Sequence, residues 1–354
     1  MTYTPPVLAA DPAPRDARLT LAMAEGLVLP DGPVCVLRPR AAERFDPLEM
    51  SRLYLVQGFR PDHDALLAAG YDVAIAARPA PAVLVCLPRS KAEAFGLIAQ
   101  AAGAPDTELV LVDGQKTDGI DSVLKALRSR VDVSGVVSKA HGKLFWFDPR
   151  GADLSDLAFC PATISDPDLG EFHTIAGVFS ADGVDPASQM LAQALPDTLP
   201  ATMADLGAGW GYLSAAVLAR SGVETLHLIE ADATALDLAR RNITDTRAQF
   251  HWADATQIEL PARMDGVVMN PPFHTGRKAQ PELGLAFISA AARLLAPRGR
   301  LWMVANRHLP YEGALAAAFT QVEIVVENGA FRVWQATAPK RVGAARGVPA
   351  RRRR

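Results

Sequence analysis

Residues 205–214 read DLGAGWGYLS, which places Gly207, Gly209 and Gly211 in a turn between an apolar strand and an apolar helix. Glycines at these positions let the backbone turn tightly and come close to a ligand, with the N-terminus of the next helix behind that ligand. A glycine-rich turn alone fits any nucleotide-binding protein. The stretch therefore predicts an α/β nucleotide-binding fold and the place of its ligand, but not which ligand is bound.

The sequence on both sides of this turn alternates between strand and helix patterns. Strand patterns begin at residues 203, 225, 249, 264 and 301, and helix patterns cover 211–221, 233–242 and 280–296, the last ending at Pro-Arg-Gly. VEIVVENG from residue 322 and AFRVWQA from residue 330 have the pattern of a closing hairpin. The second half therefore predicts a doubly wound sheet with an antiparallel end.

The first half repeats the α/β rhythm without the glycine turn. β-rich runs begin at residues 34, 53, 73, 83, 108 and 143, with Ala/Leu-rich helical stretches between them. No DxGxG turn follows these strands, and the nearest candidate has Lys116 and Asp118 in place of spaced glycines. An Asp-, Pro- and Gly-rich stretch predicts a linker near residues 150–168. We expect two α/β domains, of which only the second binds a cofactor.

The composition fits a globular protein of two domains. The chain has 354 residues, against roughly 150 for an ordinary domain, and 49% of them are hydrophobic. No uncharged apolar run reaches the ~18 residues of a membrane span, and the start of the chain has no signal-like segment. Cys35, Cys86 and Cys160 form no CxxC pair, and no histidines cluster at metal spacing. We expect a cytoplasmic protein without disulfides or a metal.

The basic charge is concentrated at the carboxyl end. Residues 339–354 carry seven Lys or Arg and no acid, so the formal charge of −3 for the whole chain becomes −10 for residues 1–338. Such a tail suits a polyanion such as RNA. Because 29 of the 36 basic residues are arginines, an unstructured solubilising tail is the alternative.

Two acidic residues end the strands that follow the glycine turn. Glu230 ends the next strand, where a carboxylate can accept hydrogen bonds from both hydroxyls of a ribose. Asp254 ends the third strand, beside the expected position of an adenine. A solvated strand end would also explain Glu230, and a helix N-cap would explain Asp254. Together with the turn, these residues favour a ligand that contains a nucleoside.

Asn270, Pro271, Pro272 and Phe273 end the fourth strand and form the most specific motif of the chain. Both prolines have a fixed φ and no N–H, so the segment is stiff and rich in acceptors. If the Asn270 side-chain oxygen and the Pro271 carbonyl each accept an N–H from an exocyclic amine, the nitrogen lone pair is directed at an electrophile. Phe273 can stack on the base. The alternative is a turn that ends a strand, with Phe273 in the core.

Longer strings extend this motif: GVFSADGVDPASQML from residue 177, NPPFHTG from 270, VANRHLPYE from 304 and AFRVWQA from 330. In these strings the chain resembles class I S-adenosylmethionine-dependent methyltransferases that modify an amine. More narrowly, it resembles the ribosomal RNA small subunit methyltransferase C family, which acts on guanine N2, or its large-subunit relative. The resemblance covers about residues 170–338. GQKTDGIDSVLKAL from residue 114 also resembles that family's amino-terminal domain.

The resemblance implies two tandem Rossmann-like methyltransferase domains. A degenerate substrate-recognition domain would cover residues 1–165, and a catalytic domain with a seven-stranded mixed sheet would cover 166–338, before the basic tail at 339–354. The cofactor would be S-adenosylmethionine, held by Asp205, Gly207, Gly209, Glu230, Asp254 and Asn270. The guanine would be held by the catalytic segment of Asn270, Pro271, Pro272 and Phe273. The segment Phe179–Gln189 would lie across the cofactor mouth, with no roles assigned to its residues.

The activity expected from this resemblance is methylation of guanine N2 in ribosomal RNA, with 16S RNA as the first candidate. The partner would be ribosomal RNA or the small ribosomal subunit, with no membrane, and a monomer is favoured. The cysteine positions agree with amine chemistry. Methylation of a pyrimidine at C5 usually begins with attack by a thiolate, and no cysteine follows Cys160.

Three alternatives stay open at this point. Adenine N6 and protein glutamine can use the same cradle, although relatives that act on glutamine typically have Tyr where Phe273 stands. A non-catalytic RNA-binding assembly factor would not need Asp205, Glu230 and Asn270 together. His308 and Tyr311, in the loop after the fifth strand, could border the base pocket or only hold their loop in place.

Overall fold

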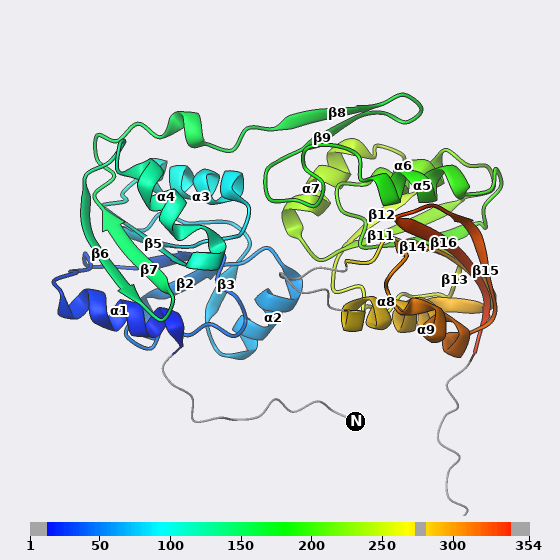
Figure 1. Cartoon of the computed structure of the whole chain (residues 1–354), viewed down its shortest axis with the longest axis horizontal. Coiled ribbons are helices and arrows are strands. Elements are labelled where there is room, and N and C mark those ends of the chain that lie inside the picture. Colours follow the sequence, from blue (N-terminus) through cyan, green and yellow to red (C-terminus); the bar gives the residue numbers. More distant parts are fainter. Residues whose placement is uncertain (1–12, 273–280, 341–354) are drawn as a thin grey trace, which may run out of the picture. The chain divides into compact units, whose positions relative to one another are not determined.

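Both halves of the chain are built on a seven-stranded sheet, and the two sheets have the same strand order (Figure 1). The structure is a computed structural model that describes residues 13–272 and 281–340. One sheet runs β3-β2-β1-β4-β5-β7-β6 and the other β12-β11-β10-β13-β14-β16-β15. Counted within each sheet, both follow the order 3-2-1-4-5-7-6. Each half is therefore Rossmann-like with an antiparallel end. The sequence predicts that end for the second half, and for the first half only the alternation of strands and helices.

The first sheet consists of short strands that are parallel except at one edge. Its strands are β1 (Val34–Leu37), β2 (Leu53–Val56), β3 (Asp72–Ala74), β4 (Ala82–Cys86), β5 (Leu109–Gln115), β6 (Val133–Lys139) and β7 (Gly142–Phe147). Its helices are α1 (Pro14–Ala24), α2 (Arg60–Ala68), α3 (Lys91–Gly103) and α4 (Ile120–Leu127). Strand β7 is antiparallel to both β5 and β6.

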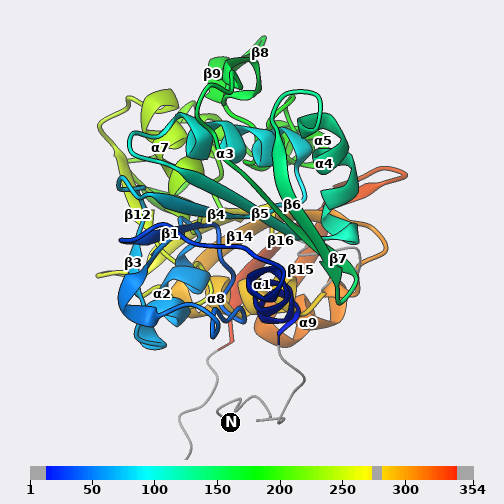
Figure 2. The same ribbon diagram turned by 90° about the vertical axis from the view of Figure 1, so that its left-hand side faces the viewer.

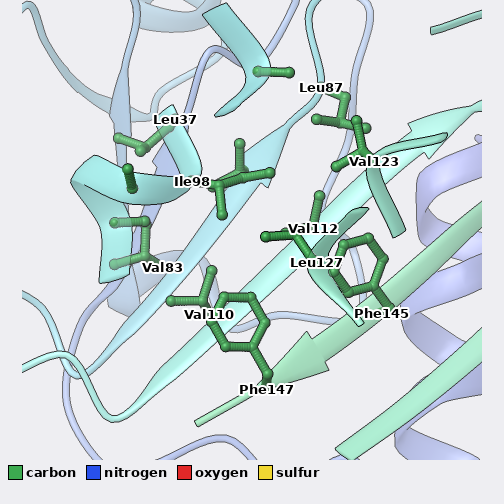
Figure 3. Packing of buried hydrophobic residues seen from close by; sticks show 14 of the residues in the cluster. Leu37, Val83, Leu87, Ile98, Val110, Val112, Val123, Leu127, Phe145 and Phe147 are labelled. Carbon is green, nitrogen blue, oxygen red and sulfur yellow. The ribbon is translucent and has the colours of Figure 1, made fainter. Parts of the chain in front are cut away.

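Side chains of the first sheet alternate between two apolar layers, as the period of a strand requires. Val83, Val110 and Phe147 pack with Ile98 of α3 and Leu127 of α4 on one face (Figure 3). Their neighbours along the strands pack on the other face, which α1 and α2 cover (Figure 2). Two buried layers explain why these strands are nearly continuous apolar runs.

The second sheet has longer strands at its antiparallel edge. Its strands are β10 (Thr202–Leu206), β11 (Thr225–Glu230), β12 (Ala248–Trp252), β13 (Met264–Met269), β14 (Leu295–Asn306), β15 (Phe319–Glu327) and β16 (Phe331–Pro339). Its helices are α5 (Pro186–Ala194), α6 (Tyr212–Leu218), α7 (Ala233–Asn242), α8 (Pro281–Leu294) and α9 (Tyr311–Ala318). Helices α8 and α9 cover one face, and α5, α6 and α7 lie on the other (Figure 1).

Two segments differ from the sequence expectation. The stretch expected as a linker, near residues 150–168, overlaps a hairpin of β8 (Ala162–Asp166) and β9 (Gly170–Thr174). Its Asp and Pro residues make the tight turn, since Asp166 Oδ1 accepts the N–H groups of Asp168 and Leu169, each at 3.0 Å. The turn chemistry was therefore visible in the sequence, but its flanking strands are too polar to be recognised.

The end of α8 is the second difference. The helix ends at Leu294, and β14 begins at Leu295 rather than at residue 301. The pairing with β13 shifts register between Met264 and Gly266, so that Leu295 and Arg300 oppose these two residues. Residues 296–299, which include a proline and a glycine, are accommodated in this irregularity of the strand.

The chain folds into two compact units. The first unit comprises residues up to Thr163 with His173–Asp182 and Asp232–Thr234, and the second comprises Ile164–Phe172, Gly183–Ala231 and the residues from Ala235 onward. Within residues 13–272 and 281–340, no helix is both long and apolar enough to cross a membrane. The same residues contain no group of three or more His, Cys, Asp or Glu side chains that could hold a metal ion.

Candidate active site

The glycine-rich turn joins β10 to α6 with three residues in the left-handed region. Gly207, Gly209 and Gly211 have φ of +78°, +56° and +99°. At Gly211 an added Cβ would lie 3.1 Å from Ile243 and 3.6 Å from the Cα of Ala239 in α7, so this glycine lets the start of α6 pack closely against α7. At Gly209 a Cβ would meet no atom within 4 Å. Backbone conformation, and space for a ligand, therefore explain the glycine at 209.

Glu230 lies at the end of β11 and is tied to this turn. Its Oε2 accepts the N–H of Gly209 at 2.8 Å. On the other side, the indole N–H of Trp252 donates to the carbonyl of Ala231 at 2.9 Å and holds the chain that follows Glu230. The turn and the carboxylate thus form one edge of the candidate site, where the sequence expects a ribose.

Asp254 follows β12 and makes a local turn. Its Oδ1 accepts the N–H of Thr256 at 2.8 Å and the hydroxyl of the same residue at 2.7 Å. This turn is not the helix N-cap that the sequence leaves open as an alternative, since residues 253–263, all of which the structure describes, form no helix between β12 and β13. The contact with an adenine remains a prediction for Asp254.

Asp205 is enclosed beneath the turn, with an exposed fraction of 0%. Its Oδ2 accepts the hydroxyl of Ser214 at 2.7 Å, whereas its buried Oδ1 has no hydrogen-bond partner in the described part of the chain. Burial raises the pKa of this carboxyl, the Ser214 hydrogen bond opposes the shift and the charge of Glu230 adds to it, so that the pKa is about 7. A buried oxygen without a donor is costly and calls for a ligand or a water molecule.

Asn270 follows β13, the strand that pairs in parallel with β10 in the middle of the sheet. Its Nδ2 donates to Asp185 Oδ2 and to Ser188 Oγ, both at 2.9 Å. Its Oδ1 accepts no hydrogen bond from residues 13–272 or 281–340. Pro271 is buried and Pro272 is exposed, while Phe273 lies outside the described residues. Among the described residues, the side-chain amide of Asn270 therefore has hydrogen-bond partners only at its nitrogen.

Comparisons with known proteins identify the family. Residues 170–335 match the family described as "Methyltransferase small domain". The ribosomal RNA small subunit methyltransferase C of Shewanella baltica is 30% identical over 288 residues, which are 77% of this chain and 78% of that protein. The chain belongs to the ribosomal RNA small subunit methyltransferase C family. The resemblance seen in the sequence strings is thereby confirmed.

Two further matches are a relative that acts on large-subunit ribosomal RNA and a solved structure. The ribosomal RNA large subunit methyltransferase G of Alcanivorax borkumensis is 34% identical over 170 residues, 46% of this chain and 43% of that protein. The structure of a Thermus thermophilus 16S rRNA N2 methyltransferase, in complex with AdoMet and guanosine, matches with a TM-score of 0.76 and 24% identity. That match covers 91% of this chain and 92% of the other, and it confirms the fold of two Rossmann-like sheets.

An aromatic cluster beside the glycine-rich turn was not predicted from the sequence. Phe172 of β9 packs with Trp210 of the glycine-rich turn at 5.2 Å between ring centroids and with Tyr212 of α6 at 5.8 Å. The Tyr212 hydroxyl donates to Asp166 Oδ2 at 3.0 Å. The cluster holds the hairpin against the turn. The sequence feature that could have indicated this cluster is Trp210. A glycine-rich turn does not need a bulky side chain, so a tryptophan within it suggests packing against another element.

Tyr311 holds its loop rather than bordering a pocket. The side chain has an exposed fraction of 0% and belongs to the core between the sheet and helices α8 and α9. Gly284 of α8 leaves room for it, since a Cβ added there would lie 2.0 Å from the Tyr311 hydroxyl oxygen. Of the two roles left open by the sequence, the structure supports the packing role.

Proposed function

We propose that this chain methylates the exocyclic N2 amine of a guanine in ribosomal RNA, with S-adenosylmethionine as the methyl donor and 16S RNA as the first candidate. The observation that carries the proposal is the orientation of Asn270. Both N–H groups of its amide have acceptors inside the protein, which leaves the oxygen as the acceptor for an amine. Two acceptors, the Asn270 oxygen and the Pro271 carbonyl, suit an amine with two hydrogens better than a hydroxyl with one.

The cofactor fits the residues around the glycine-rich turn. The buried Oδ1 of Asp205 needs a hydrogen-bond donor, the space beside Gly209 admits a ligand close to the backbone, and Glu230 lies at the same edge. With Gly207 and Asp254, these residues would hold S-adenosylmethionine. The bound cofactor supplies a methyl group on a sulfonium, which is an electrophile without help from a metal.

The protein's contribution to the reaction would be positioning. The amine nitrogen of guanine is a weak nucleophile because its lone pair is delocalised into the ring. The Asn270 oxygen and the Pro271 carbonyl accept one N–H each, which favours the tetrahedral nitrogen and directs its lone pair toward the methyl group. The proton then leaves to solvent. The guanine must be unstacked to reach the site, so a flipped or single-stranded base is the substrate.

The choice of 16S RNA rests on coverage of the relatives. The Shewanella baltica small-subunit enzyme matches 77% of this chain, whereas the large-subunit enzyme of Alcanivorax borkumensis matches 46%. The second candidate is therefore a guanine of 23S RNA, with the same chemistry.

Mass spectrometry of nucleosides from separated 16S and 23S RNA tests the proposal. Cells without the gene should lack one N2-methylguanosine in 16S RNA, and the intact gene should restore it, whereas a gene encoding Asn270→Ala should not. A loss confined to 23S RNA selects the second candidate. A loss of N6-methyladenosine instead, or no change in either RNA, would contradict guanine as the substrate.

A further inference from the structure

We propose that Asp185 and Ser188, at the N-terminus of α5, are positioning residues that determine which atom of the Asn270 amide faces the substrate. The inference rests on the proposed function, because it assigns a task to the oxygen of Asn270. Asp185 and Ser188 lie 85 and 82 positions before Asn270 in the chain, within the segment whose residues the sequence left without roles.

Asp185 makes two hydrogen bonds with one oxygen. Its Oδ2 accepts the N–H of Ser188 at 2.8 Å, as the N-cap of α5, and also accepts an N–H of Asn270 at 2.9 Å. The hydroxyl oxygen of the buried Ser188 accepts the second Nδ2 hydrogen bond, also at 2.9 Å. Both hydrogens of the planar amide are thereby directed to α5, and the oxygen points the other way.

The carboxylate of Asp185 favours one of the two orientations of the Asn270 amide over the other. An ionised carboxylate accepts hydrogen bonds and donates none. If the Asn270 amide were turned over, its oxygen would face the Asp185 carboxylate and two acceptors would repel each other. A turned amide would also present N–H groups to the amine of the substrate, where the proposed reaction needs an acceptor. Asp185 therefore excludes the unproductive orientation of Asn270.

Helix α5 is suited to hold this arrangement. Pro186 is at its first position, where a fixed φ favours the start of a helix. The helix packs against β14, β16 and α6, so that Asp185 is held by the same sheet that carries Asn270. A direct contact between two parts of a rigid core preorganises the Asn270 oxygen before the substrate binds.

Asp185→Asn separates the orienting role from the capping role. Asn caps helices about as well as Asp, so the variant keeps α5 stable. However, an Asn side chain can present either a donor or an acceptor to Asn270, and the two amides can then turn over. We expect the single-turnover rate, at saturating RNA and cofactor, to fall on the order of 10- to 100-fold. The dissociation constants of both ligands should stay within about threefold.

Ser188→Ala removes one of the two acceptors and keeps the carboxylate. The amide then keeps its preferred orientation but loses part of its support, so we expect a smaller decrease in rate, roughly threefold to tenfold. Asp197→Asn is the control. Asp197 is an exposed aspartate of the second unit. This variant removes an equal charge and should leave the rate unchanged.

The experiment measures single-turnover methylation of small ribosomal subunits from a strain without the gene, with radiolabelled S-adenosylmethionine. Asn270→Ala is the reference and should lower the rate on the order of 100-fold. Combining Asp185→Asn with Asn270→Ala should give no further loss, because Asp185 acts through Asn270.

Three results would overturn the inference. If Asp185→Asn keeps the wild-type rate while Asn270→Ala is slow, the orienting role is wrong and the proposed function stands. If Asp185→Asn lowers the rate by the same factor with and without Asn270→Ala, Asp185 acts independently of Asn270. If Asn270→Ala itself keeps the wild-type rate, or the product is not N2-methylguanosine, the proposed function fails first.

Discussion

Asp205 shows how the candidate site affects stability at the scale of one residue. The carboxyl is fully buried, and its pKa of about 7 lies well above the ordinary value of 3.8. A carboxyl with a raised pKa in the folded protein stabilises the fold only while it is protonated. Its contribution is complete below pH 4 and is lost as the pH rises to about 7, at a cost on the order of 4 kcal/mol. Burial of this ionisable carboxyl thus makes the fold less stable near neutral pH than in acid.

We predict that Asp205→Asn makes the ligand-free protein more stable than wild type at pH 8, and that the gain shrinks as the pH falls toward 5. Asn can keep a hydrogen bond with Ser214 and has no charge to desolvate. Urea unfolding at both pH values measures the difference. Asp197→Asn, at an exposed position of the second unit, is the control. A gain of equal size at both pH values would show that the Asp205 charge is not the cause.

The residues of the site were predictable from the sequence to different degrees. The positions of Asp205, Glu230 and Asn270 followed from spacing, because the carboxyl ends of parallel strands share one edge of a sheet. The orientation of the Asn270 amide did not, since it depends on Asp185 and Ser188, which reach it only through the packing of α5. Local sequence patterns contain no information about such distant partners.

At the scale of elements, β11 and β12 are joined by a pair of histidines. Nδ1 of His227 and Nε2 of His251 lie 2.9 Å apart, and His227 is buried. Burial lowers the pKa of both rings, and the charge of His251 lowers that of His227 further. The pair can share one proton between the facing nitrogens, but two positive charges would repel each other.

We predict that this pair makes the protein less stable in mild acid. A histidine with a lowered pKa in the folded protein contributes stability that is present above pH 6.5 and is lost as the pH falls through the folded value. Replacing both His227 and His251 with Leu should flatten the decrease in melting temperature between pH 7.5 and pH 5.5. The control is His173→Gln, at an exposed position of β9. An unchanged slope in the double variant would exclude the pair as its source.

Most elements were predictable because apolar runs bounded by turns are strong signals, as at β10, β11 and α7. Helix α1 was not, because Arg15, Asp16 and Arg18 suggest a solvated segment. In the structure Arg15 and Arg18 are buried and bind the fully buried Asp113 of β5. Strand β6 was missed for a similar reason, since at the sheet edge it is only partly apolar. Both segments form because of contacts with residues that are distant in the sequence, which local patterns do not show.

At the scale of the whole molecule, the two units share a topology but not a binding loop. Arg38, after β1, occupies the place of Gly207: its φ is +61°, and its N–H donates to Val56 at 2.9 Å as that of Gly207 donates to Ile229. The Arg38 side chain pairs with Glu93. Between β1 and β2 lies only the short 3₁₀ turn Met50–Arg52, where the second unit has α6. The first unit therefore lacks both the spaced glycines and the helix behind them.

We predict that one molecule of S-adenosylmethionine binds per chain, in the second unit. Titration calorimetry of the intact protein should give a stoichiometry of about one. Gly209→Arg should abolish binding, because position 209 needs a positive φ and a bulky side chain would enter the space beside the turn. A stoichiometry of two would contradict the prediction and indicate a second site. One cofactor still bound to Gly209→Arg would contradict the assigned role of the turn.

The basic tail gives a last prediction, about RNA binding by the whole chain. It rests on the sequence, because residues 341–354 lie outside the described part of the structure. Six of the seven basic residues at 339–354 lie within 341–354. If these six contact phosphates, deleting 341–354 should raise the dissociation constant for ribosomal RNA and make its salt dependence shallower, since each phosphate contact releases counterions. The affinity for S-adenosylmethionine should not change. Binding measured between 50 and 300 mM salt tests this expectation, and an equal slope for both proteins would leave the tail a solubilising segment.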